Sequence, residues 1–370
     1  MPITNESVNI EYRQLSEQME AHRSLFIDWL NFKVFNTIAN RNFLHELFPK
    51  LEKETIERGN SNFFSFSHPE RILKMHYHIQ EIEEINCKIS SRGLSEIFKN
   101  RTDYTITDFL KWILRNCKQK LCKGGEVIPA GITRIDFALD DFEGLIDLKK
   151  ISRLEEDGHT VTRLDKVLFL TGWSHKDRSY RGRTMYIGDR AASTFIRYYD
   201  KYAKCKEQKI EIDENIKIWN RFEIELKDSR ANVFTENYIN NPHFCPYEAL
   251  LAIYRFTKKS VPISEKNKQR FETADFYSEF LKNTKIARRL KVPQLVYDLE
   301  NLERYVEKTA SSAYDVYARV HGEDELLEVI RNATKRTNEN PKYRNIIEKS
   351  AHSKFDYSDD KIIKKFKKAS

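Results

Sequence analysis

The sequence predicts an α+β protein with a curved, mainly antiparallel sheet, helices on one face of it, and a helical C-terminal region. Four segments in the middle third alternate apolar and polar residues strictly, as strands with one buried face do. They are Ile132–Asp140, Thr184–Ile187, Thr194–Tyr199 and Trp219–Leu226. The short loop Gly188–Ser193 joins the second to the third and predicts a hairpin. Helical spacing of apolar residues follows at Pro246–Thr257 and across Pro293–Ala333.

The N-terminal third mixes strands and helices. Residues 1–24 are polar and predict a partly helical arm. The expected elements that follow are a strand at Phe26–Phe35, a helix at Asn42–Arg58, strands at Lys74–Ile79 and Ile85–Ser90, and an amphipathic helix over residues 106–122. Ser91-Arg92-Gly93 marks a turn after the second of the short strands. This organisation predicts an arm (1–24), a main domain (25–285), a helical region (286–334) and a basic flexible tail (335–370).

Composition favours a polyanionic partner. The 370 residues include 64 Lys and Arg against 56 Asp and Glu, a net charge of +8 with a pI near 9.0. Many ordinary soluble proteins are as basic, so the surplus alone does not decide the partner. The hydrophobic share of 40% excludes wholesale disorder, and 23 Phe, 18 Tyr and 4 Trp suit sheets and base-stacking surfaces alike.

Cysteine usage and hydropathy predict a cytoplasmic protein with no membrane partner. The five cysteines form no CxxC pair and have no histidines at zinc-ligand spacing, which is typical of free thiols in a reducing compartment. The N-terminus resembles no signal peptide, and no run of 18 apolar residues occurs. The cysteines are Cys87, Cys117, Cys122, Cys205 and Cys245.

Two predicted strands place carboxylates on one face. Side chains two residues apart share a face, so Asp136 and Asp140 point the same way, with the small Ala138 between them. Arg134 lies on that face too, while Ile135, Phe137 and Leu139 point into the core. The arrangement leaves room for a hard cation held by oxygen ligands. A solvated polar face with an Arg–Asp pair explains the same pattern.

The strand Arg221–Leu226 repeats this arrangement, with Arg221, Glu223 and Glu225 on one face. If the two strands are neighbours, Asp136 and Glu223 could converge on one metal ion, because close buried carboxylates repel each other unless a cation or the arginines intervene. A structural ladder of salt bridges is the alternative.

The segment Thr194–Lys201 supplies a candidate nucleophile, because a tyrosine can attack a phosphodiester and keep the DNA end as a phosphotyrosine. Arg197 and Lys201 are expected on the same strand face as Tyr199, where either cation would lower the pKa of the phenol. A second class of nicking enzymes uses a His-hydrophobic-His metal motif, which His76-Tyr77-His78 matches, with Tyr198 as the nucleophile of a Tyr-x-x-Lys pattern. The two motifs lie about 120 residues apart, a long separation for that class, and short motifs arise readily by chance.

Taken in order, these segments resemble the replication initiation factor (Rep-trans) family, from about Phe26 to about Leu281. Its members include initiators of small Gram-positive rolling-circle plasmids, relaxases of some integrative conjugative elements, and initiators of certain filamentous phages. The segments that carry the resemblance are Ile27–Leu30, a degenerate turn at Ser91–Gly93, Thr133–Asp140, Thr184–Gly188 with Ser193, Ile196–Lys201 and Arg221–Glu225. Thr133–Asp140 is similar to the family's Arg-x-Asp-x-Ala-x-Asp strand. Ile196–Lys201 is similar to its Arg-x-Tyr-Asp-Lys strand, and Arg221–Glu225 to its Arg-x-Glu strand.

The resemblance implies a saddle-like core related to the TATA-binding protein and a specific set of site residues. The nucleophile is the tyrosine before Asp-Lys, Tyr199, although the adjacent Tyr198 leaves the register open by one residue. Asp136, Asp140 and Glu223 would hold Mg²⁺ or Mn²⁺, and Arg197, Lys201 and Arg221 would serve catalysis. Arg134, Arg183, Lys364 and Lys365 are expected DNA contacts.

The implied function is origin-specific nicking and closing of one DNA strand to start rolling-circle replication, in the 25–285 domain. Expected partners are double- and single-stranded origin DNA, a host helicase and polymerase, and a second copy of the chain. A conjugative relaxase with the same chemistry and a non-catalytic DNA-binding regulator are the alternatives.

Overall fold

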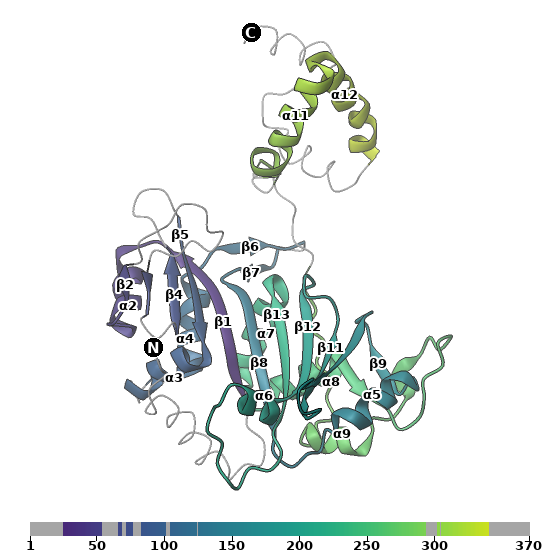
Figure 1. The fold of residues 1–370 in the computed structure, drawn as a ribbon. Coiled ribbons are helices and arrows are strands. Elements are labelled where there is room, and N and C mark those ends of the chain that lie inside the picture. Colours follow the sequence, from purple (N-terminus) through teal and green to yellow (C-terminus); the bar gives the residue numbers. More distant parts are fainter. Residues whose placement is uncertain are drawn as a thin grey trace. The chain divides into compact units, whose positions relative to one another are not determined.

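A computed structural model describes residues 25–53, 66–68, 72–76, 83–100, 104–123, 125–293, 302–303 and 305–339. The chain divides into two compact units, one of residues 1–121 and 125–293, the other of residues 122–124 and 294–370 (Figure 1). The predicted arm at 1–24 lies outside the described residues.

The first unit is built on a ten-stranded sheet with the order β10-β11-β12-β13-β8-β1-β5-β4-β3-β2. All nine pairings between its described strands are antiparallel. The strands are β1 (Leu25–Phe35), β2 (Glu52–Lys53), β3 (Phe66–Ser67), β4 (Leu73–His76), β5 (Glu84–Ser90), β8 (Ile132–Asp141), β10 (Val167–Trp173), β11 (Tyr180–Ile187), β12 (Thr194–Asp200) and β13 (Asn220–Lys227). The predicted antiparallel sheet is therefore confirmed.

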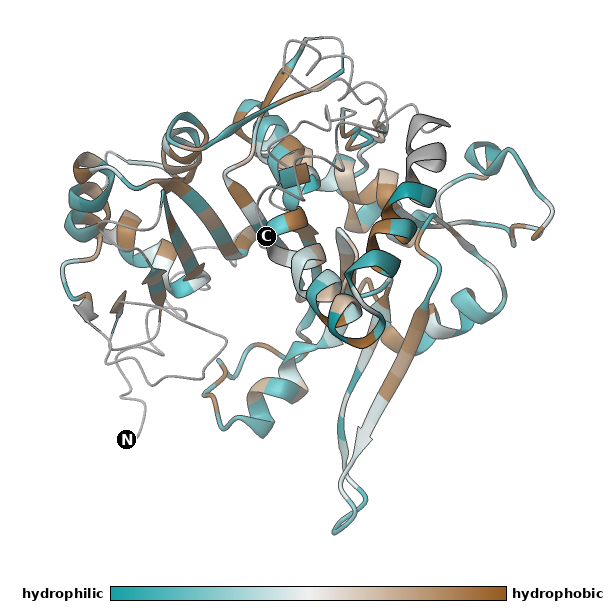
Figure 2. Ribbon diagram, turned by 90° about the horizontal axis from the view of Figure 1, so that it is seen from above, coloured by the Kyte–Doolittle hydropathy of each residue, from teal (hydrophilic) through white to brown (hydrophobic). Residues whose placement is uncertain are grey.

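One face of this sheet forms the hydrophobic core with a set of helices. Alternation along the strands, which Figure 2 shows as changing hydropathy along the ribbon, sends Ile135, Phe137 and Leu139 into that core. The helices that contribute buried residues to it are α2 (Ile38–Leu47), α3 (Ser91–Asn100), α4 (Ile106–Arg115), α5 (Leu148–Glu156), α7 (Asp228–Asn240), α8 (Cys245–Ile253) and α9 (Asp275–Phe280). The prediction of helices on one face is thus confirmed.

A short helix, α6 (Lys201–Glu207), follows β12 directly and lies against the other face. It begins where the Asp200 carboxylate accepts a hydrogen bond from the Ala203 N–H at 2.8 Å, a normal helix N-cap. Its buried Cys205 packs with Ile216 and Trp219 in a small separate cluster. The helix stands over the polar face of the sheet at β11, β12 and β13.

The remaining elements are short. Two small antiparallel sheets pair β6 (Gln119–Leu121) with β7 (Val127–Pro129) and β9 (Thr160–Thr162) with β14 (Tyr254–Phe256), and η1 spans Lys268–Arg270. The second unit contains η2 (Val306–Ala310), α11 (Ser311–His321) and α12 (Glu323–Glu339). No helix in the described part of the chain is long and apolar enough to span a membrane.

Several boundaries differ from the sequence predictions. The helix expected at Asn42–Arg58 occupies 38–47, and β2 follows it. The helices expected over 106–122 and 246–257 end at Arg115 and Ile253, and β6 and β14 take the remainder. The expected turn at Ser91–Gly93 is the first turn of α3 instead. Helix α12 runs through Glu339, past the boundary predicted at 334, and residues 340–370 lie outside the described residues.

Candidate functional site

The polar face of the sheet carries the predicted carboxylates and Tyr199 in three adjacent rungs across the strands, the third of which pairs Asp136 with Glu225. Tyr199 on β12 pairs with Arg221 on β13, and Arg221 pairs with Asp140 on β8. In the next rung, Arg197 pairs with Glu223, whose other neighbour is Ala138. The structure therefore places β8 and β13 side by side, which is the condition that the predicted convergence of their carboxylates required.

Tyr199 lies on this face and touches a carboxylate. Its hydroxyl donates a hydrogen bond of 2.6 Å to Glu223 Oε1, and only 6% of the residue is exposed. Tyr198 points the other way, where its ring packs on Phe222 with centroids 4.0 Å apart and belongs to the hydrophobic core. Of the two adjacent tyrosines, Tyr199 alone shares a face with the acidic residues.

Arginines link the carboxylates of the second rung and its neighbour. Arg197 Nη2 contacts Glu223 Oε2 at 2.8 Å and Asp136 Oδ2 at 3.2 Å. Arg134 makes a bidentate pair with Asp136, at 2.8 and 2.6 Å, and reaches Glu225 Oε2 at 2.9 Å. Because these carboxylates are almost fully buried, removal of one arginine would leave an uncompensated charge.

Arg221 organises a second cluster at the end of the first rung. Its guanidinium makes a bidentate pair with Asp140, at 2.6 and 2.8 Å, and contacts Asp28 Oδ1 at 3.2 Å. Asp28 is the extra residue of an irregularity in the pairing of β1 with β8, between Ile27 and Trp29. Such a bulge re-aims a side chain, and here it brings the Asp28 carboxylate within reach of Arg221.

Burial sets the proton affinities of these groups. It raises the pKa of Asp136 to about 6, against the opposing effects of Arg134 and Arg197. Burial also raises the pKa of Tyr199 well above its ordinary value; Arg221 lowers it and the Glu223 carboxylate raises it further. The Tyr199 phenol therefore keeps its proton at neutral pH and offers that proton to Glu223.

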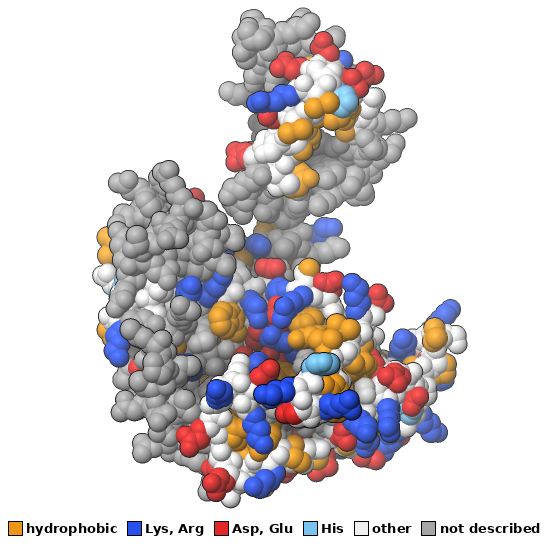
Figure 3. Space-filling view, viewed as in Figure 1, with side chains coloured by type: hydrophobic (Ala, Val, Ile, Leu, Met, Phe, Trp, Pro, Cys, Tyr) orange, Lys and Arg blue, Asp and Glu red, His pale blue; other side chains and the backbone are white. Residues whose placement is uncertain are grey.

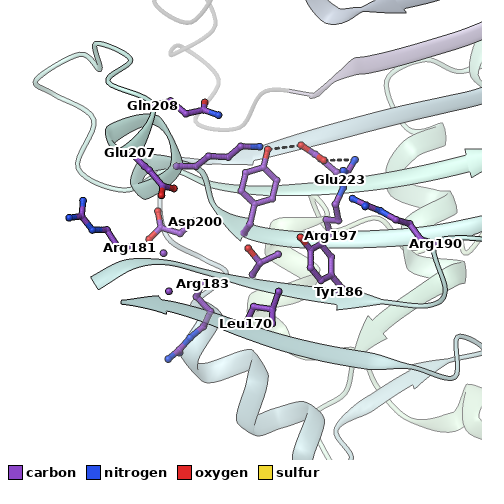
Figure 4. A pocket seen from close by; sticks show the side chains of 15 residues that line it. Leu170, Arg181, Arg183, Tyr186, Arg190, Arg197, Asp200, Glu207, Gln208 and Glu223 are labelled. Carbon is purple, nitrogen blue, oxygen red and sulfur yellow. Dashed lines mark hydrogen bonds and ion pairs between the residues drawn. The ribbon is translucent and has the colours of Figure 1, made fainter. Parts of the chain in front are cut away.

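A cavity of about 470 Å³ opens beside Tyr199, between strands β10–β12 and helix α6 (Figure 4). Its lining includes five cationic and three acidic residues: Arg181, Arg183, Arg190, Arg197 and Lys204, with Asp200, Glu207 and Glu223. Lys204 Nζ lies 4.8 Å from the centre of the Tyr199 ring. The cavity thus combines a phenol, a carboxylate that accepts its proton, and a surplus of positive charge.

Some predicted residues lie elsewhere than expected. Lys201 does not continue the strand face, because the Asp200 cap turns the chain into α6, and its Nζ lies 5.5 Å from the Trp219 ring. Arg183 lines the cavity, while its Nε donates to Thr171 Oγ1 at 3.1 Å. Lys364 and Lys365 lie outside the described residues.

Sequence reasoning missed Asp28 and Lys204. Asp28 reaches the site only through the bulge, which the alternating pattern of β1 conceals. Lys204 reaches it because α6 folds back over Tyr199. Asp200, as a helix-capping residue after an apolar strand, was the signal that a short helix starts there and that Lys204 lies on it.

The described residues do not support the alternative in which the His76-Tyr77-His78 motif binds the metal and Tyr198 is the nucleophile. His76 lies on β4, which β5, β1, β8 and β13 separate from β12 in the sheet order. Tyr77 and His78 lie outside the described residues. The Tyr198 hydroxyl, which that alternative would use, belongs to a ring in the hydrophobic core.

Two of the three predicted metal ligands converge. No group of three or more His, Cys, Asp and Glu side chains among the described residues is arranged to hold a metal ion. Asp136 Oδ2 and Glu223 Oε2 nevertheless contact the same Arg197 nitrogen, so one positive group already bridges them. Asp140 instead places both its oxygens on Arg221. Proteins often bind Mg²⁺ through one or two carboxylates plus substrate phosphates. Arg197 already pairs with both Asp136 and Glu223, and of the two only Glu223 lines the cavity.

Comparison with known proteins assigns the family. The sequence profile of the replication initiation factor family matches residues 130–330, more than half of the 370-residue chain. The chain belongs to the replication initiation factor family. The match contains β8, β12, β13 and α6, so the Tyr199 rung and the carboxylates of β8 and β13 are part of the family region. The N-terminal part of the predicted resemblance, before residue 130, lies outside the matched range.

One curated protein and one solved structure are similar to this chain. The chain is 23% identical over 150 residues to "Putative DNA relaxase NicK" of Bacillus subtilis (strain 168), a match over 40% of this chain and 42% of that protein. The chain thus spans less than half the length of that relative. A solved structure of a rolling circle replication initiator protein from Geobacillus stearothermophilus superposes with a TM-score of 0.54 and 19% identity, over 74% of this chain and 100% of the other. This likeness establishes the fold that the two chains share.

Proposed function

We propose that this member of the replication initiation factor family nicks and rejoins one strand of origin DNA, with Tyr199 as the nucleophile. The observation that carries the proposal is the 2.6 Å hydrogen bond from the Tyr199 hydroxyl to Glu223, at the wall of a cationic cavity. A buried nucleophile paired with a base in an open, positively charged cavity suits attack on a phosphodiester.

The step balances as a transesterification. The Tyr199 proton passes to Glu223 Oε1, and the phenolate oxygen forms a bond to the scissile phosphorus. The bond from phosphorus to the 3′ oxygen breaks, and that oxygen takes a proton. The products are a 5′-phosphotyrosine and a free 3′-hydroxyl that a polymerase can extend. Because the phosphodiester is conserved, reversal of the same step closes the strand without ATP.

The cations around Tyr199 have distinct proposed roles. Arg197 and Lys204 stabilise the charge that develops on the phosphoryl oxygens, since both line the cavity. Arg221 lowers the pKa of Tyr199 against the effect of burial, while Asp140 and Asp28 hold its guanidinium in place.

Asp136 and Glu223 would hold Mg²⁺ or Mn²⁺, for the reason that their oxygens already share one cationic neighbour. Glu223 could serve in both roles, because Oε2 faces Arg197 and Oε1 faces the phenol. When bound, the divalent ion would neutralise charge on the scissile phosphate.

A conjugative relaxase is the second candidate, and the similarity to the Bacillus subtilis protein favours it. The chemistry is the same and the DNA site differs. Nicking of a transfer origin in preference to a replication origin would select this reading.

The test incubates the full chain with supercoiled DNA of its own genetic element and Mg²⁺. Wild type, Tyr199→Phe and Tyr198→Phe are compared for nicked circles with protein attached at the 5′ end. The proposal expects loss of both products with Tyr199→Phe only. Loss with Tyr198→Phe only would move the nucleophile by one residue. Absence of any covalent product with wild type would favour the non-catalytic regulator.

A further inference from the structure

A row of exposed apolar side chains lies on the site face at the edge of the sheet. Leu168 and Leu170 on the edge strand β10 are 53% and 47% exposed. Leu170 pairs with Thr184, and Thr184 pairs with Tyr199, so Leu170 belongs to the Tyr199 rung. With neighbouring strands about 4.8 Å apart, Leu170 stands roughly 10 Å from Tyr199 along the sheet.

The neighbouring rung adds aromatic surface. Leu168 pairs with Tyr186, whose ring stacks on Phe195 with centroids 5.6 Å apart and an angle of 24°. The Arg190 guanidinium lies 5.8 Å from the Phe195 ring. Leu168, Leu170 and Tyr186 are here named the apolar strip. Leu170 and Tyr186 also line the cavity, while Phe195 is only 5% exposed and supports the Tyr186 ring. Figure 3 shows hydrophobic side chains gathered beside Lys and Arg on this face.

Leu168 and Leu170 at the outer end of the apolar strip are about half exposed, and the surroundings of the strip favour a polyanion. The cavity next to it holds Arg181, Arg190 and Lys204. Beyond Leu170, the next rung is Gly172 opposite Gly182, and both glycines line the cavity. An occupant that combines apolar planar groups with regular negative charge matches this mixture.

Single-stranded DNA has those two properties together, whereas a duplex hides the faces of its bases within the stack. The position agrees with the chemistry, because a strand whose phosphate lies at Tyr199 has its neighbouring nucleotides within reach of Leu170. The apolar strip would therefore receive bases while the cavity receives phosphates.

We infer that the apolar strip binds unpaired bases of the cleaved strand next to the scissile phosphate. This inference rests on the proposed function, since it takes the cavity as the phosphate site. It adds a base-binding site on β10 and β11 that is separate from the charged residues of the rungs.

The test measures binding by fluorescence anisotropy of two probes with the same phosphates, an oligothymidine of about 12 nucleotides and an abasic oligomer of equal length. The full chain carries Tyr199→Phe, so that neither probe is cut. Leu168→Ser/Leu170→Ser is compared with Ile263→Ser, which removes a fully exposed apolar side chain from a loop elsewhere in the chain.

The parent should bind oligothymidine about tenfold more tightly than the abasic probe, and the preference should persist as salt weakens both. The double variant should lose most of that preference with the abasic affinity within twofold of the parent, and the Ile263 variant should keep it. Equal affinity of the parent for both probes would overturn the inference without use of any variant.

Two further results would also overturn it. An unchanged preference in the double variant would place the bases elsewhere, and a changed oligomeric state with an unchanged preference would assign the strip to contact between copies. Nicking of supercoiled DNA by the Tyr199 form of each chain is followed separately. If the chain with Tyr199 does not nick DNA but Leu168→Ser/Leu170→Ser still abolishes the base preference, the proposed function is rejected and the base site stands.

Discussion

Strands β12 and β13 present two faces of opposite chemistry, and adjacent residues divide between them. Tyr198 and Phe222 pack ring against ring in the hydrophobic core. Tyr199 and Glu223, one residue further along each strand, form a buried hydrogen bond on the polar face. The core face gains free energy from apolar burial, whereas the polar face spends part of that gain to keep charges desolvated. Buried charged residues that cost stability and gather in one cluster mark a place where chemistry is expected.

The largest effect should come from the two tyrosines. Tyr199→Phe should reduce nicking by at least about a thousandfold, because it removes the attacking oxygen. Tyr198→Phe should leave the rate within about threefold and change the free energy of unfolding by less than about 1.5 kcal/mol. Nicking is measured on supercoiled DNA and stability by urea denaturation. Equal losses of nicking in both variants would remove the distinction between the faces.

Arg221 should matter most for stability on the polar face. Arg221→Met leaves Asp140 and Asp28 without their shared cation and should destabilise the protein by about 3–5 kcal/mol. The double variant Arg221→Met/Asp140→Asn should recover much of the loss, because it also removes a buried charge. Urea denaturation of the DNA-free protein measures both. A single-variant loss below about 1 kcal/mol would mean that the cluster is well solvated.

Asp136 should make stability depend on pH. Its native pKa of about 6 lies above the ordinary aspartate value of 3.8, so the native state holds a proton that the unfolded state has released between these values. The contribution of this group to stability is therefore present at pH 4 and declines as pH rises through 6. The free energy of unfolding of Asp136→Asn should therefore rise relative to that of wild type between pH 4 and pH 7, by up to about 3 kcal/mol. Parallel stability curves for the two proteins would contradict the raised pKa.

Lys204 should have the smallest of these effects. Lys204→Ala removes a cation 4.8 Å from the Tyr199 ring and should slow nicking about tenfold with little change in stability. Lys206→Ala is the matched control, since Lys206 lies on the same helix over Tyr202 and does not line the cavity. Similar losses in the two variants would point to general attraction of DNA in place of a local role.

Alternation made the polar face predictable, and its exceptions explain what was missed. Strict period-two patterns at β8, β12 and β13 predicted which residues share the face, and antiparallel pairing brought Asp136 and Glu223 to one arginine. The position of Asp28 depends on a bulge and that of Lys204 on a helix cap, neither of which leaves a periodic signal.

Two missed elements have their own physical reasons. β10 exposes Leu168 and Leu170 where alternation would place polar residues, so its sequence does not read as a half-buried strand. Helix α7 buries Asn232, whose amide satisfies both the N–H and the C=O of Ile132 at the start of β8, at 2.9 and 2.7 Å. That polar contact interrupts the apolar spacing by which a helix is predicted.

The most direct test of the central claim identifies the residue that carries the DNA. After reaction with an origin oligonucleotide, the covalent complex is digested with nuclease and protease, and the nucleotide-bearing peptide is sequenced by mass spectrometry. The account predicts a nucleotide on the oxygen of Tyr199, with Tyr198 of the same peptide unmodified. A nucleotide on Tyr198, or on a peptide that contains neither residue, would contradict the assignment of the polar face as the catalytic one.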